Sequence, residues 1–143
     1  MLQKQEDIGF LLKVISDKLG ASCDSQLKKK GMTISQVRVI EFLVHNNNSA
    51  TQKQIEDFLE VSHPAVTGLV ERLNENGFVT YHTDEKNRHN KIVTLTSKAI
   101  AEAHVLNEER NSVEAKLVKN LTDDEIASLR KSLFVLYENI RSI

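Results

Sequence analysis

The sequence predicts a mainly α-helical fold with a small β-hairpin, and three observations lead to it. Two short amphipathic segments, each opened by a capping residue, follow one another between residues 51 and 77. Two β-rich segments, at 78–81 and 91–95, flank a polar stretch and predict a hairpin with a long tip. Longer amphipathic helices are expected on both sides. The central order is a helix-turn-helix followed by a wing, a shape that inserts a helix into a DNA groove.

The N-terminal segment predicts one amphipathic helix over residues 4–29. Three lysines at 28–30 fall in its last turn, where cations interact favourably with the helix dipole, and Gly31 is expected to end it. Its apolar positions recur in steps of three and four residues: Ile8, Leu11, Leu12, Ile15, Leu19, Cys23 and Leu27.

Three capping boxes predict the starts of later helices, because in each a Thr is followed three residues later by Gln or Glu. The boxes begin at Thr33, Thr51 and Thr122. Residues 46–49 are expected to form a polar turn between the first two of these helices. The last helix repeats apolar residues along one face, namely Ile126, Leu129, Leu133, Leu136, Tyr137 and Ile140.

The helix before the hairpin is the predicted recognition helix. Ser62 is placed to cap it, and Pro64 falls in its first turn, where a missing N–H costs nothing. The helix is expected to end near Asn76-Gly77, and Thr96 is expected to cap the helix after the hairpin. Its inward positions are Val66, Leu69, Val70 and Leu73.

Length and composition indicate an ordinary globular protein. The 143 residues predict a single domain over 1–143, with a DNA-binding lobe at 33–96. Cys23 is the only cysteine, so no intrachain disulfide is expected and a reducing compartment fits. The N-terminus does not resemble a signal peptide, and no apolar run approaches the roughly 20 residues that span a membrane. We therefore expect a cytoplasmic protein without a membrane partner.

Charge alone does not indicate a nucleic-acid partner, because the net charge is −1. Residues 62–98 hold five Lys or Arg against four acids. DNA binding must therefore depend on the placement of a few cations. The sequence contains no Gly-rich phosphate loop, no zinc-protease motif and no nucleophile elbow, so neither an enzyme nor a cofactor is expected.

Four short stretches resemble the MarR family of bacterial transcriptional regulators, and the resemblance covers most of the chain. They are residues 31–33 with Gln36, residues 61–67 (VSHPAVT), residues 73–79 (LNENGFV) and residues 93–96 (VTLT). The resemblance implies a homodimer joined by the helices at 1–30 and 97–143. Two lobes would bind a palindromic double-stranded DNA operator, and a small-molecule inducer would release a repressor. The apolar faces of the end helices favour a dimer independently.

The chain departs from the family pattern at positions that bear on the site. The turn between the two DNA-binding helices usually holds Gly and here holds Glu60, which predicts modest backbone strain. Glu56 replaces a small residue, so a rotated helix or a solvated carboxylate is expected. At the wing tip, where Asp and Arg usually lie two residues apart, Asn87 and His89 flank Arg88.

The candidate DNA contacts form three groups. The start of the recognition helix is expected to face the major groove through Ser62, His63, Pro64, Thr67 and Gly68. The wing tip is expected to reach the minor groove through Lys86, Arg88 and His89, with either Arg88 or His89 entering it. Helix ends offer phosphate contacts at Thr33, Gln36, Arg38, Thr51, Gln52 and Arg72, although capping alone also explains the Thr and Gln residues.

Other interpretations stay open. Cys23 lies on an apolar stripe, which favours a buried thiol over a redox sensor. His104 and Glu108 lie four residues apart, a spacing that can chelate a metal, but no further ligand is evident and no metal site is predicted. The near-neutral lobe also fits a winged-helix module for protein–protein assembly that does not bind DNA.

Overall fold

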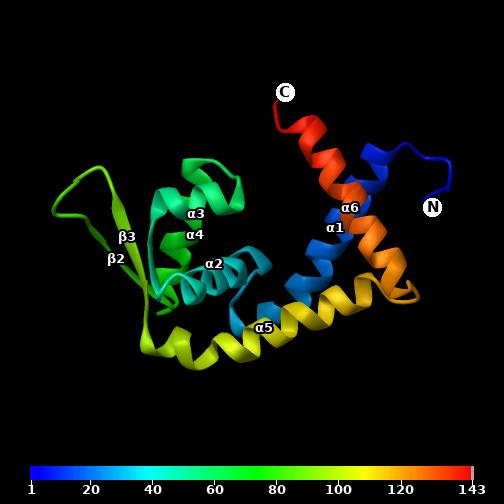
Figure 1. The fold of residues 1–143 in the computed structure, drawn as a ribbon. Helices are drawn as coiled ribbons and strands as arrows, with labels where there is room; N and C mark the ends of the chain where they lie inside the picture. The colour runs from blue at the N-terminus through cyan, green and yellow to red at the C-terminus, as the bar shows by residue number, and fades with distance from the viewer. Residues whose placement is uncertain (143) are drawn as a thin grey trace. The chain divides into compact units, whose positions relative to one another are not determined.

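The computed structural model describes residues 1–142, except for the side chains of residues 22–26. By its internal contacts the chain forms two compact units, Met1–Val113 and Glu114–Ile143. The first unit contains the whole predicted lobe, and helix α5 (Ser97–Leu117) runs across the division (Figure 1). Helices with a small antiparallel sheet confirm the predicted fold class, whereas the single-domain assignment stays a prediction.

Helix α1 (Ile8–Leu27) begins four residues later than the pattern indicated. The cause is Asp7, whose Oδ1 accepts a hydrogen bond from the backbone N–H of Phe10 at 2.8 Å and so satisfies one of the unpaired N–H groups of the first turn. A short 3-10 helix, η1 (Lys28–Lys30), follows. Gly31, with φ of 72°, then ends the segment in the left-handed conformation, as predicted.

The three predicted capping boxes are present. In each, the Thr hydroxyl accepts from the third backbone N–H of the helix, and the side chain of that third residue accepts from the Thr backbone N–H. They open α2 (Ile34–His45), α3 (Gln52–Leu59) and α6 (Asp123–Ile140). The predicted recognition helix is α4 (His63–Glu75), which follows α3 after a short turn.

A three-stranded antiparallel sheet takes the place of the expected hairpin. Strands β2 (Val79–Thr83) and β3 (Lys91–Leu95) form the wing, with Val79 paired to Leu95 and Thr83 to Lys91. Strand β1 (Ser49–Thr51) pairs with the other side of β3, so the strand order is β1-β3-β2.

The expected polar turn at 46–49 is therefore wrong at its last residue, since Ser49 begins β1. Asn47 and Asn48 make the turn with φ of 57° and 67°, a conformation that Asn tolerates better than most residues. A strand of three residues is too short for its alternation to be recognised from sequence.

One hydrophobic core joins the helices of the lobe to the sheet. Ile55 of α3, Val66 of α4 and Val93 of β3 all have 0% exposure within the same cluster. Ala99 and Leu106 extend this cluster into the first half of α5. Thr96 caps α5 as expected, because its Oγ1 accepts from the N–H of Ala99 at 3.3 Å. The recognition helix and the wing are thus fixed to one shared core.

The end helices leave apolar side chains uncovered in the single chain. Among the described residues of α6 none is buried, and Leu133, Phe134 and Ile140 are 41%, 62% and 62% exposed. In α1, Ile8 and Phe10 are also exposed. Over the residues described, none of the helices combines the length and apolar character needed to cross a membrane.

Candidate nucleic-acid interface

The turn from α3 to α4 sets the position of the recognition helix. Glu60 ends α3 with φ of 54°, the left-handed conformation that a non-Gly residue adopts at a cost of about 1 kcal/mol, as its place in the turn predicted. Ser62 then caps α4 by accepting from the N–H of Ala65 at 3.3 Å, with Pro64 in the first turn. The predicted roles of Ser62 as the cap and of Pro64 in the first turn are both confirmed. The free N–H groups of this start favour an anion nearby.

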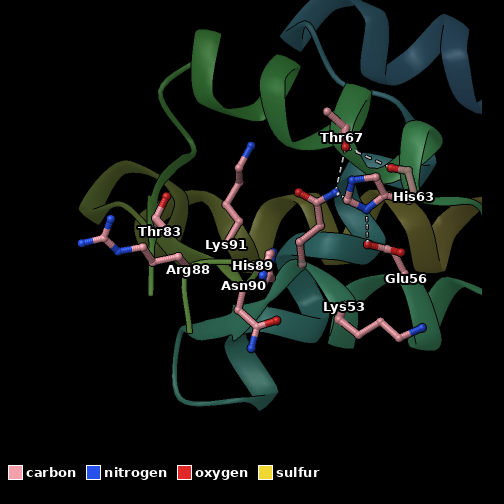
Figure 2. A pocket seen from close by; sticks show the side chains of 10 residues that line it. Lys53, Glu56, His63, Thr67, Thr83, Arg88, His89, Asn90 and Lys91 are labelled. Carbon is pink, nitrogen blue, oxygen red and sulfur yellow. Dashed lines mark hydrogen bonds and ion pairs between the residues drawn. The ribbon is translucent and has the colours of Figure 1, made fainter. Parts of the chain in front are cut away.

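A hollow of about 400 Å³, which we call the wing hollow, lies where α3, α4 and the wing meet (Figure 2). Three of its side chains, Lys53, Arg88 and Lys91, are cationic, whereas Glu56 is the one acid among those that line it. Positive charge is therefore concentrated here, although the chain as a whole carries a net charge of −1. The lining residues are Gln52, Lys53, Glu56, His63, Thr67, Thr83, Arg88, His89, Asn90 and Lys91.

A chain of hydrogen bonds joins α3 to α4 at the back of the wing hollow. The Gln52 amide N–H donates to Thr67 Oγ1 at 2.8 Å, and the Thr67 hydroxyl donates to the backbone carbonyl of His63 at 3.0 Å (Figure 2). Gln52 is only 3% exposed, so its amide depends on these partners. The bonds hold the first turn of α4 against α3.

The expectation of a solvated Glu56 carboxylate is wrong, whereas a rotated α3 stays a prediction. The Glu56 side chain is 13% exposed, and its Oε2 lies 2.9 Å from Nδ1 of His63. The imidazole therefore takes the place of water as the hydrogen-bond partner of the carboxylate. Glu56 is therefore part of the site.

Two of the six predicted phosphate contacts are not supported. Gln36 is 2% exposed and its side chain accepts from the N–H of Thr33, while Gln52 is engaged with Thr67. Buried side chains with satisfied hydrogen bonds are not free to meet a phosphate, so we revise both assignments. Contacts from the others stay predictions, and none of them lines the wing hollow: Thr33, Arg38, Thr51 and Arg72.

The wing tip is held by its own backbone and by Asn87. The Asn87 Oδ1 accepts from the N–H of His89 at 3.1 Å, and the Asn87 carbonyl accepts from the N–H of Asn90 at 2.9 Å. Arg88 and His89 are both exposed at this tip, and the Arg88 side chain points away from His63 (Figure 2). Which of the two enters a minor groove stays open, and Lys86 is exposed beside them.

Gly68 lies on α4 one turn beyond Pro64. A Cβ atom added to Gly68 would meet no described atom within 4 Å. Packing within the chain therefore does not require glycine at this position, and close approach of DNA stays a prediction beside the alternative of a simply tolerated glycine.

Lys53 and Lys91 belong to the site, although the sequence did not predict them there. Lys53 pairs with Asp57 at 3.0 Å, and Lys91 lies 4.5 Å from the centre of the Tyr81 ring. The hydrogen bond to Asp57, with its charge attraction, raises the pKa of Lys53 above its ordinary value. The spacing of four between Gln52 and Glu56, and between His63 and Thr67, could have indicated two facing helix surfaces.

The remaining sequence candidates lie elsewhere. The Cys23 side chain is outside the described residues. His104 Nε2 and Glu108 Oε1 lie 3.1 Å apart, and both side chains are exposed. No group of three or more potential metal ligands occurs among the residues that the structure describes.

Comparisons with known proteins agree with this geometry. The family model described as MarR family matches residues 30–88. An uncharacterised HTH-type transcriptional regulator of Bacillus subtilis strain 168, YwoH, is 30% identical over 107 residues, which cover 75% of this chain and 77% of that protein.

Solved structures with the same fold span nearly the whole chain. MepR of S. aureus, crystallised as a complex with DNA, has a TM-score of 0.87 at 20% identity and covers 95% of this chain and 100% of its own. The organohalide-sensing regulator RdhR, in a 2,4-dichlorophenol-bound form, has a TM-score of 0.83 at 18% identity, with coverages of 98% and 86%. At these identities the likeness shows the fold.

The hydrogen-bond chain predicts a stability effect at Thr67. Replacing Thr67 with Val keeps the shape but removes the acceptor of the buried Gln52 N–H, so the free energy of unfolding should fall by about 1–3 kcal/mol. Urea denaturation followed by circular dichroism measures it. Thr80→Val, on the exposed face of β2, is the matched control and should stay within about 0.5 kcal/mol of the wild type. Equal losses of unfolding free energy in both variants would contradict the stabilising role of these hydrogen bonds.

Proposed function

Because this chain belongs to the MarR family of HTH-type transcriptional regulators, we propose that it binds a palindromic operator in double-stranded DNA as a homodimer and represses transcription. The observation that carries the proposal is the wing hollow. It concentrates Lys53, Arg88 and Lys91 beside the first turn of the recognition helix in a chain of net charge −1. A bacterial cytoplasmic location follows from this role.

The arrangement of the lobe suits both grooves of a duplex. The start of α4 presents Ser62, His63 and Pro64, all exposed, to base edges in the major groove. The wing tip, with Arg88 and His89, extends toward the adjacent minor groove. The phosphate backbone between the grooves then runs past the wing hollow, where its charge meets the cations.

Salt dependence tests the proposed phosphate contacts. Affinity for an operator selected from random DNA should fall steeply as salt rises, because each neutralised phosphate releases condensed counterions. Lys53→Gln and Lys91→Gln should each reduce the slope of log affinity against log salt by about 1 per protomer. Fluorescence anisotropy over a salt series provides the measurement.

Lys13→Gln is the control for these variants. Lys13 lies on α1 and pairs with Asp17 at 2.7 Å, away from the wing hollow, so its loss should leave the slope unchanged. A wild-type protein that binds no duplex even at low salt would exclude the regulator and leave the protein–protein assembly module as the better explanation.

The uncovered end helices support the homodimer. Leu129, Leu133 and Phe134 of α6 and Ile8 of α1 are large apolar side chains that are 41–62% exposed in the single chain. Burying such surface against a second copy removes it from water, at roughly 25 cal/mol per Å². Two lobes joined in this way would meet half-sites about one helical turn apart on one face of the duplex.

The dimer predicts a mass of about twice 16.2 kDa for the wild type in solution. Leu133→Glu should raise the dimer dissociation constant at least about 10-fold, because an unpaired carboxylate is costly to bury. Lys131→Glu adds a carboxylate at an exposed position outside the apolar repeat of the same helix and should leave the dimer intact. Sedimentation equilibrium measures both, with circular dichroism to check folding. A monomeric wild type at micromolar concentration would contradict the proposal.

A second hollow supports the proposed response to a small molecule. It measures about 330 Å³, lies between α2 and α5, and includes Val44, Ile100 and Ala103. His45 donates from Nδ1 to the Glu41 carbonyl at 2.8 Å, which leaves its Nε2 as an acceptor. Apolar side chains beside polar groups such as His45 and Asn107 suit a small phenol. Arg110 joins α5 to Glu41 of α2 at 2.7 Å, so a ligand between these helices would strain that ion pair.

Filling this hollow should abolish the response. Ala103→Trp should keep operator binding but lose any decrease in affinity that a panel of phenols, 2,4-dichlorophenol included, produces in the wild type. Anisotropy titrations with and without each compound measure this. Ala101→Trp, at an exposed position of the same helix, should keep the response. Loss of the response in Ala101→Trp alone would assign the ligand to another site.

A further inference from the structure

We propose that Glu56 is a positioning residue that fixes which ring nitrogen of His63 carries the proton, and so decides which base the recognition helix reads. His63 is the first residue of α4 and its side chain is 71% exposed, while the Glu56 side chain beneath it is 13% exposed. The inference rests on the proposed function, since it assigns a task to His63 in operator recognition.

The ionised carboxylate of Glu56 can only accept hydrogen bonds. Its Oε2 lies 2.9 Å from His63 Nδ1, a distance that requires a proton on that nitrogen (Figure 2). The neutral ring therefore holds its proton on Nδ1, and Nε2 is left as an acceptor on the exposed side.

Gln52 does not compete for this nitrogen. Its Nε2 lies 3.2 Å from His63 Nδ1. With a proton on Nδ1, both nitrogens are donors, and two donors do not form a hydrogen bond. The Gln52 amide instead donates to Thr67 at 2.8 Å, and the Thr67 hydroxyl donates to the His63 carbonyl. The neighbouring polar groups are thus satisfied with the proton on Nδ1.

The tautomer has a direct consequence in the major groove. An Nε2 acceptor pairs with the exocyclic amino group of adenine or cytosine, whereas an Nε2–H donor would pair with guanine N7 or O6, adenine N7 or thymine O4, and so would not favour cytosine. By holding the proton on Nδ1, Glu56 selects an amino-bearing base opposite His63. The Thr67 hydroxyl donates its proton to the His63 carbonyl, so it is not available to donate to a base.

A carboxylate on the DNA face also repels phosphate, so the removal of Glu56 has two effects that must be separated. Asp57 is the matched control because it is the next residue of α3, carries the same charge and is paired with exposed Lys53. Glu56→Gln and Asp57→Asn each remove one negative charge and should both strengthen binding to all duplexes alike. Only Glu56→Gln should change the base preference.

The first measurement needs no DNA. Nitrogen-15 NMR of histidine-labelled free protein at about pH 8.5, where an ordinary imidazole is neutral, reports the tautomer of each ring. The His63 signals are identified by their loss in His63→Gln. The wild type and Asp57→Asn should show the proton on Nδ1, and Glu56→Gln should shift it toward Nε2. A wild-type His63 with its proton on Nε2 would overturn the proposal.

The second measurement is operator selection from random DNA with each variant at the same pH. The wild type and Asp57→Asn should share a preference for adenine or cytosine at one position of each half-site. Glu56→Gln should weaken that preference at least about fivefold, and it should change nothing further in a His63→Ala background. An unchanged preference in Glu56→Gln would refute the readout role.

The two measurements separate this inference from the proposed function. If the wild type selects no operator, the regulator itself is excluded and the readout falls with it, whatever the tautomer. If an operator is selected but the tautomer or the preference does not respond to Glu56→Gln, the regulator stands and the positioning role is refuted.

Discussion

The shared core of the lobe is the constraint on which the rest of the structure depends. Ile55, Val66 and Val93 come from α3, α4 and β3, and each is removed completely from water. Burial of one such side chain stabilises by roughly 1.5–3 kcal/mol, so the recognition helix and the wing cannot move independently without exposing apolar surface. The wing hollow exists because these elements converge on one core while their polar surfaces stay apart.

Polar contacts then fix the details that apolar packing leaves free. Hydrophobic contacts are non-directional, whereas the bond from Gln52 to Thr67 is satisfied only when α3 and α4 meet in one register. Glu60, in the left-handed conformation, ends α3 and allows α4 to begin after a short turn. The same register brings Glu56 under His63, so the contact between the two helices and the chemistry of the recognition surface are set together.

Local charge matters more here than net charge. The acids and bases of the chain nearly balance, yet Lys53, Arg88 and Lys91 meet in one hollow. Asp57 forms an exposed ion pair with Lys53 and raises the pKa of that lysine, and a phosphate can take the place of Asp57 in the pair. A near-neutral regulator of this kind relies on shape and hydrogen bonding for a larger share of its recognition, so the identity of each polar contact carries more weight.

The sequence by itself determined the elements whose signals are local. The capping boxes at Thr33, Thr51 and Thr122, the left-handed end at Gly31 and the two wing strands all depend on residues a few positions apart. Tertiary structure alone decided what depends on distant pairing. It added β1 to the sheet, buried Gln36 and Gln52 away from phosphate, and gave Glu56 a histidine partner seven residues away across the turn. Such contacts follow from how helices and strands pack, which the periodicity of one segment does not encode.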